Sequence, residues 1–121
     1  IPDVGGTYFL PRAMGLAKAI GSSIFADKIM AAEAHEIGLI YEYVEDDNYD
    51  MHLKSRVEYL ANGPTVAFAG IKTAMRKSLN NSLDEQLELE AKLQKKCGNT
   101  RDFQEGVLAF HEKRDAKFEG R

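Results

Sequence analysis

Short breaks that end one helix and open the next recur along this sequence, and they predict a chain built mainly of helices. Asn62-Gly63-Pro64 joins a stop signal to a proline, which suits the first turn of a helix because it has no N–H to lose. Ser82-Leu83-Asp84-Glu85 fits the S-x-x-E capping box that opens a helix. The predicted helices cover about residues 8–15, 16–26, 31–37, 46–61, 64–79, 82–97 and 102–117.

Only one segment has the alternation typical of a β-strand. Residues 39–44 alternate β-branched and aromatic side chains, and we expect them to form a single short strand. The expected fold class is therefore mainly α with one short strand. This inventory is unusual for a complete enzyme and better suits half of one.

Composition bounds the class of protein. The chain has 121 residues, 44% of them hydrophobic, which is globular composition and enough for one domain over residues 1–121. No apolar run approaches the roughly 18 residues of a membrane span, and a net charge of −3 argues against nucleic acid as a partner. Cys97 is the only cysteine, so no disulfide forms within the chain, and we expect a reducing, cytoplasmic location.

Asp3 beside Gly5-Gly6 is the first place where chemistry could reside. Two residues without Cβ atoms let a backbone pass close to a ligand, and a carboxylate can act as a general acid or base. A simpler interpretation is also open, in which Asp3 caps the following helix and the glycines form a turn. The spacing alone favours this simpler interpretation, because Asp-x-Gly-Gly is a weak pattern.

The last predicted helix offers a second candidate site. Gly106, Phe110, Lys113 and Lys117 recur at helical spacing and would form one strip. A bare glycine, a flat ring and two ammonium groups suit a nucleotide, because the ring can stack on a base and the cations can meet phosphates. The alternative is a phenylalanine in the core surrounded by solvated lysines.

A polar row in the preceding helix is the third candidate. Gln86, Glu90 and Gln94 lie between two apolar rows, so we expect them to face inward, with an arginine or backbone donors as the partner of Glu90. We interpret the row as structural polarity at a packed or subunit interface. The three histidines match no metal-ligand spacing, and no metal site is expected.

Several stretches in order resemble the crotonase (enoyl-CoA hydratase/isomerase) superfamily. They are the opening Ile1-Pro2-Asp3-Val4-Gly5-Gly6-Thr7 with Leu10-Pro11-Arg12, the A-x-x-A-x-x-x-G-L pattern over residues 31–40, and Glu105-Gly106 followed by Ala109-Phe110-His111-Glu112-Lys113-Arg114 and Phe118. The resemblance implies the C-terminal half of an α/β spiral fold. Residues 1–44 would hold the active-site loop with helices and the strand, and residues 45–121 a helical trimerisation region. The absent N-terminal half would supply most of the sheet and both oxyanion-hole N–H groups.

Position 3 bears on the reaction. Relatives that hydrate enoyl-CoA typically have glycine there and use two upstream glutamates, whereas Asp3 is similar to the ring-1,2-epoxyphenylacetyl-CoA isomerases. Aspartate at this place also occurs as the nucleophile of 4-chlorobenzoyl-CoA dehalogenases. The resemblance implies that Asp3 is the catalytic acid/base, and that Phe110 and Lys113 reach the adenine and phosphates of coenzyme A.

The expected function is isomerisation of an enoyl-CoA or epoxyphenylacetyl-CoA thioester by a full-length parent, with this chain inactive alone. Asp3 is the expected catalytic residue, and Gly5, Gly6, Phe110 and Lys113 are expected to contact the substrate. No separate cofactor is expected, because coenzyme A is part of the substrate. We expect a homo-oligomer, a trimer or a dimer of trimers. Two alternatives stay open: an enoyl-CoA hydratase, and a non-catalytic oligomerisation module.

Overall fold

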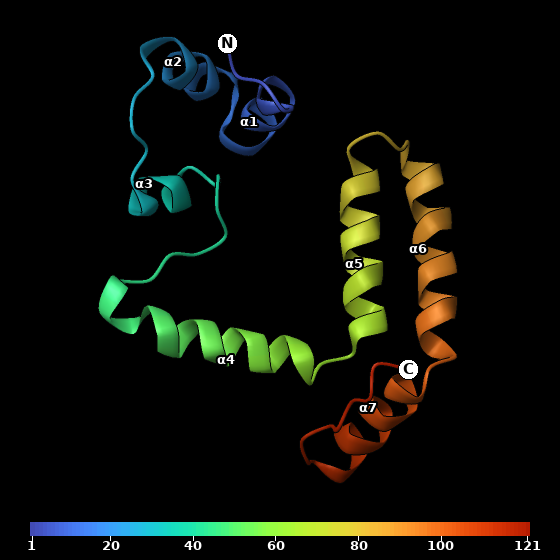
Figure 1. The fold of residues 1–121 in the computed structure, drawn as a ribbon. Coiled ribbons are helices and arrows are strands. Elements are labelled where there is room, and N and C mark those ends of the chain that lie inside the picture. Colours follow the sequence, from blue (N-terminus) through green and yellow to red (C-terminus); the bar gives the residue numbers. More distant parts are fainter. The chain divides into compact units, whose positions relative to one another are not determined.

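The computed structural model describes residues 1–121 and divides into two compact units, Ile1–Tyr49 and Asp50–Arg121. Every regular element is helical (Figure 1), so the prediction of a mainly helical chain is confirmed.

The first unit holds three α-helices and a short 3-10 helix. They are α1 (Gly6–Met14), α2 (Leu16–Phe25), α3 (Ala31–Glu36) and η1 (Asp46–Asn48). Gly15 separates α1 from α2. Its φ is 82°, a backbone conformation that residues with a Cβ rarely adopt. The two helices pack on each other, and Ala19 of α2 is buried. The sequence-based break near Gly15 is thus confirmed.

The predicted strand at residues 39–44 is wrong. The segment forms turns and irregular backbone, and its first two N–H groups are already used: those of Leu39 and Ile40 donate to the carbonyl of Ala34, at 2.8 and 3.2 Å. A strand also needs a neighbouring strand to accept its ladder of hydrogen bonds. No second strand exists in this chain, so alternation of side chains alone does not produce one.

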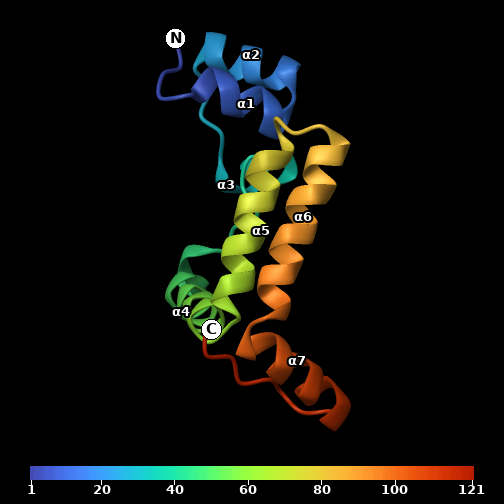
Figure 2. The ribbon, with the colours of Figure 1, turned by 90° about the vertical axis from the view of Figure 1, so that its right-hand side faces the viewer.

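The second unit contains the four longest helices. They are α4 (Tyr49–Ala61), α5 (Thr65–Ser78), α6 (Leu83–Gly98) and α7 (Arg101–Glu112). Figures 1 and 2 both show α5 and α6 side by side as an antiparallel pair, with α7 at the far end of α6. The break between α4 and α5 lies at Asn62-Gly63-Pro64, as predicted, and the ring of Tyr59 stacks on that of Phe68 across it.

The start of α6 confirms the predicted capping box. The hydroxyl of Ser82 accepts from the N–H of Glu85 at 3.4 Å, and the Glu85 carboxylate accepts from the N–H of Ser82 at 2.7 Å. The carboxylate also lies at the positive end of the helix dipole. Hydrogen bonding from Ser82 keeps the pKa of Glu85 below its ordinary value. Local sequence therefore sets this helix boundary without help from distant residues.

The chain buries very little apolar surface of its own. The buried hydrophobic residues are Ala19, Ala34 and Ala109, all of them alanines. Large side chains are instead exposed, including Phe25 at 75% and Phe110 at 82%. Apolar area of this extent is unusual on a monomer and normally marks contact surfaces.

Candidate functional site

The Asp3 loop is a tight turn that leads into α1. The N–H of Gly6 donates to the carbonyl of Asp3 at 2.8 Å, and the two central residues have positive φ, 50° at Val4 and 86° at Gly5. Positive φ at both central positions is the signature of a type I′ turn, and for a β-branched valine it is a strained conformation. The turn thus fixes the backbone on either side of position 3.

The side chain of Asp3 is exposed and makes no hydrogen bond or ion pair. It does not cap α1, whose N-cap is Gly5 without any side-chain cap. The simpler interpretation of this segment is therefore right about the turn and wrong about the cap. The loop presents an unengaged carboxylate to solvent.

Close backbone packing explains the glycine at position 6. A Cβ there would lie 2.8 Å from the Cβ of Pro2, closer than side chains tolerate. Gly5 has a separate reason, its φ of 86°. Both glycines are thus required by the turn, and the predicted contact of Gly5 and Gly6 with a substrate stays a prediction.

The strip predicted along the last helix is only half formed. Helix α7 ends at Glu112, and Lys113 is its C-cap in the left-handed conformation, with φ 53° and ψ 43°. Gly106 and Phe110 share a face of the helix, but Lys117 lies in the segment that follows it. The predicted helix over residues 102–117 is therefore too long, because the left-handed residue turns the chain back.

Phe110 and Lys113 both lie at the end of α7. The N–H of Lys113 donates to the carbonyls of Ala109 and Phe110, closing the helix. The Phe110 ring is exposed rather than part of a core, which excludes the core alternative for this residue within the chain as described. An exposed ring and a lysine three residues further on could stack on a base and meet a phosphate.

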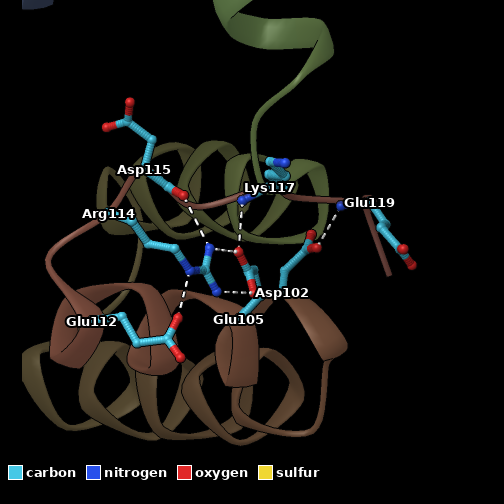
Figure 3. Close-up of polar contacts among 7 residues, drawn as sticks. All are labelled: Asp102, Glu105, Glu112, Arg114, Asp115, Lys117 and Glu119. Atoms are coloured by element: carbon cyan, nitrogen blue, oxygen red, sulfur yellow. Dashed lines mark hydrogen bonds and ion pairs between the residues drawn. The ribbon is translucent and has the colours of Figure 1, made fainter.

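After Lys113 the chain runs back along α7 and is held there by two carboxylates (Figure 3). Asp102 is buried, and its carboxylate accepts from the N–H groups of Glu119 and Gly120 at 2.7 and 2.9 Å. The N–H of Asp102 in turn donates to the carbonyl of Arg121 at 3.1 Å. These bonds fix the last residues against the start of α7.

Glu105 holds the other end of this returning segment. Its carboxylate accepts two hydrogen bonds from the guanidinium of Arg114, at 2.6 and 3.0 Å, and one from the N–H of Lys117 at 2.8 Å. Arg114 also donates to Glu112 at 2.6 Å. This bonding lowers the pKa of Glu105 from 4.5 to about 2, with the Arg114 hydrogen bond as the largest cause. We call residues 113–121, with Asp102 and Glu105, the C-terminal clasp.

An open apolar groove of about 380 Å³ borders the clasp. Its lining comes from the start of α5, the end of α6, α7 and the returning segment, and includes Pro64, Cys97, Phe103, Phe110 and Phe118. The ring of Phe118 lies over Gly106, where a Cβ would be 3.7 Å from it. The clasp therefore places an aromatic ring on the wall of the groove.

Only the first member of the polar row of α6 faces inward as predicted, because Gln86 is half-buried against α5 whereas Glu90 and Gln94 are exposed. Gln86 donates to the carbonyl of Ala74 at 3.2 Å and accepts from the side chain of Asn81 at 3.0 Å. Glu90 has Gln86 as its partner, at 3.5 Å, so the expectation of an arginine or backbone donors is wrong. The neutral amide of Gln86 is a sufficient partner for the Glu90 carboxylate, because Glu90 is exposed and water also solvates its charge.

No three His, Cys, Asp or Glu side chains converge on a point that could hold a metal ion. None of the helices is both long and apolar enough for a membrane span. The C-terminal clasp was not predicted from the sequence. The helical spacing of side chains in α7 continues past Lys113, and no sequence pattern indicates that a lysine adopts the left-handed backbone conformation. The acidic residues one turn apart in α7, Asp102 and Glu105, were the available signal.

All 121 residues match the Enoyl-CoA hydratase/isomerase family, and the chain belongs to that family, within the crotonase superfamily. It is 50% identical to a probable enoyl-CoA hydratase of Rhodobacter capsulatus, over 100% of this chain and 47% of that protein. It is 39% identical to the 1,2-epoxyphenylacetyl-CoA isomerase of Escherichia coli, over 100% of this chain and 46% of that protein.

The fold agrees with the sequence. The crystal structure of an enoyl-CoA hydratase/isomerase from Cupriavidus metallidurans superposes with a TM-score of 0.90 at 30% identity, over 99% of this chain and 45% of that one. The chain therefore spans about half the length of the relatives it matches. The narrower expectation of a C-terminal half is not supported, because the matches give the covered share of each relative without assigning it to that end.

Proposed function

We propose that these residues serve a CoA-thioester isomerase in which Asp3 moves the proton. The observation that carries the proposal is the exposed, unpartnered Asp3 carboxylate on a strained turn. Such a carboxylate can take a proton from the carbon next to the thioester, while the electrons move onto the thioester oxygen as an enolate. Returning the proton to the far end of the conjugated system shifts the double bond with no atom gained or lost. Backbone N–H groups are the expected donors to the enolate oxygen.

The nucleotide end of coenzyme A is assigned to α7. Phe110 is 82% exposed, so its ring is available to stack on adenine, and Lys113 follows at the helix end as a cation for phosphate. Gly5 and Gly6 are assigned to the acyl end, where a backbone without Cβ atoms lets substrate approach. The substrate class is an enoyl-CoA or an epoxyphenylacetyl-CoA.

A hydratase is the second candidate within the same family. The Rhodobacter capsulatus relative, which is named a probable enoyl-CoA hydratase, is more similar to this chain than the Escherichia coli isomerase is. The two reactions differ in their products: hydration adds one water across the double bond, and isomerisation leaves the mass unchanged.

The test uses a protein of the relatives' full length that carries residues 1–121. Wild type and Asp3→Asn are incubated with 2-enoyl-CoA and 3-enoyl-CoA. Double-bond migration is followed by the ultraviolet absorbance of the conjugated 2-enoyl thioester after chromatographic separation of the two isomers, and hydration by the mass of one added water. We expect double-bond migration by the wild type and a loss of about a hundredfold or more in Asp3→Asn, because general acid–base catalysis contributes 10²–10⁴-fold. Hydration that survives in Asp3→Asn would replace the isomerase proposal with the hydratase. The 121-residue chain alone is expected to show no turnover.

Association with further copies is the third part of the proposal. With only three alanines in its buried apolar core, the chain leaves side chains such as Leu83 and Phe103 exposed at 73% and 53%. Such surface favours a homo-oligomer, a trimer or a dimer of trimers. Analytical ultracentrifugation that finds a trimer without turnover at full length would favour the oligomerisation module instead, and a monomer would contradict both assembly proposals.

A further inference from the structure

A lysine occupies the one position of α7 where glycine is favoured. The residue that ends a helix in the left-handed conformation is usually glycine, since any Cβ is strained there. Lys113 adopts this conformation with φ 53° and ψ 43°. Strain of this kind persists where the surroundings hold it in place, and it clusters at functional sites.

The bonds that hold Lys113 come from its next neighbour. The N–H of Arg114 donates to the carbonyl of Ala109 at 3.1 Å, and its guanidinium is fixed by Glu105 through two bonds. Figure 3 shows this guanidinium between the carboxylates of Glu105 and Glu112, with the carbonyl of Asp115 as a further acceptor at 3.0 Å. These bonds fix the direction of the Arg114 donors. They also restrict the backbone conformation of Lys113, the residue before it.

We propose that Glu105 and Arg114 are positioning residues, which hold Lys113 in its left-handed turn so that its ammonium meets a phosphate of the nucleotide stacked on Phe110. This inference rests on the proposed nucleotide site and adds the device that arranges it. A paired Arg114 does not itself offer its donors to the ligand, because Glu105 and Glu112 occupy them. Its role is to fix the chain next to the residue that binds.

Electrostatics and positioning predict opposite results for one substitution. Glu105→Gln removes a negative charge near the phosphate site, and by charge alone the affinity for an anion should rise. If Glu105 positions Lys113, the same substitution releases Arg114 and the turn, and the affinity falls. The sign of the change therefore separates the two explanations.

The experiment measures binding by isothermal titration calorimetry to the protein of the relatives' full length that carries residues 1–121. The probes are adenosine 3′,5′-bisphosphate, which has the phosphates, and adenosine, which has only the stacking base. We expect Glu105→Gln and Arg114→Gln to weaken the bisphosphate about tenfold and adenosine less than about twofold, since one hydrogen bond to a charged group is lost. Arg121→Gln is the matched control, because Arg121 pairs with Glu119 at 2.8 Å in the same returning segment. It should change neither affinity.

Three results would overturn the inference. One is unchanged or tighter bisphosphate binding in Glu105→Gln and Arg114→Gln, while Lys113→Gly binds more weakly; the nucleotide site would then stand without the positioning device. Another is an equal loss for both probes, which indicates a merely structural role. The third is a wild-type chain that binds neither probe, or a Lys113→Gly variant with wild-type affinity, which removes the proposed nucleotide contact itself.

A milder substitution keeps the test valid if Glu105→Gln or Arg114→Gln fails to fold, as judged by a loss of the helical circular dichroism signal. Arg114→Lys keeps the charge but replaces the two-pronged contact with Glu105 by a single one. We expect an intermediate loss for the bisphosphate and none for adenosine. Wild-type binding of both probes by Arg114→Lys, with Lys113→Gly weakened, would overturn the positioning role.

Discussion

The carboxylate of Asp102 lies 2.7 Å from the backbone nitrogen of Glu119, seventeen residues further along the chain. This contact, with the bond to Gly120 beside it, turns a buried charge into the anchor of the returning segment. A charge at 4% exposure is tolerable only with such partners. Asp102, at the start of α7, is thereby joined to the last residues of the chain through backbone N–H donors rather than through side-chain packing.

Replacement of Asp102 by asparagine should destabilise the second unit. The amide offers one acceptor instead of two and turns an NH₂ group toward a backbone N–H, so one buried donor loses its partner. We expect a loss of about 1–3 kcal/mol in the free energy of unfolding. Urea denaturation followed by circular dichroism measures it. Asp115→Asn, at an exposed site of the same segment, is the matched control, and an equal loss in both variants would refute the anchor role.

The Glu105 bonds should make stability depend on acid. Because the pKa of Glu105 is lowered from 4.5 to about 2, its contribution is complete above about pH 4.5 and is lost as the pH falls toward 2. The difference in urea midpoint between wild type and Glu105→Gln should therefore be constant at neutral pH and shrink over this window. Glu88→Gln, at an exposed pair with Lys92, is the control and should show a smaller difference. A Glu105→Gln difference that does not change with pH would contradict the bonding described.

Gly63 is the position least able to accept a side chain. A Cβ there would lie 2.4 Å from two atoms of the Phe68 ring and 3.0 Å from the carbonyl of Tyr59. We expect Gly63→Ala to lower the free energy of unfolding by about 2 kcal/mol through overpacking. Gly21→Ala, inside α2 with open space around it, should instead raise stability by about 0.5–1 kcal/mol. Thermal unfolding of both variants checks the two signs, and a shift of the same sign in both would be inconsistent with this packing.

The capping box predicts a local loss at α6. Ser82→Ala removes the acceptor for the N–H of Glu85 and should cost about 1 kcal/mol of stability, measured by urea unfolding. Ser23→Ala, at an exposed site of α2, serves as the control. Equal midpoints for Ser82→Ala and wild type would show that the box adds nothing to the unit.

Helix boundaries were predictable where a local signal acts within one turn. Ser82 with Glu85, and the Asn62-Gly63-Pro64 break, both lie in sequence next to the backbone groups that they satisfy, so the sequence contains the whole interaction. The strand at residues 39–44 failed because a strand depends on a partner segment, which no local pattern reveals. The same limit applies to Lys113, whose left-handed turn depends on Glu105, nine residues before Arg114.

The candidate site divides in the same way. The turn that contains Asp3, Gly5 and Gly6 was predictable because it depends on residues close in sequence, and the structure has that turn. The catalytic and substrate-binding roles of these residues stay predictions. The strip through Lys117 was wrong, since it assumed that α7 continues, and the clasp was missed for the same reason. The last residues fold back because Asp102 accepts from the N–H groups of Glu119 and Gly120. Helical periodicity in the sequence does not predict a contact between residues so far apart in the chain.

The proposed CoA site is tested most directly by the affinity for coenzyme A of the protein of the relatives' full length that carries residues 1–121, measured by isothermal titration calorimetry for wild type, Phe110→Ala and Phe25→Ala. Both rings are exposed, at 82% and 75%, so the substitutions remove similar apolar surface. Wild type and Phe25→Ala are expected to bind equally, and Phe110→Ala about tenfold more weakly, because one stacked base is lost. Equal affinity in all three proteins, or no binding by the wild type, would contradict the proposed CoA site.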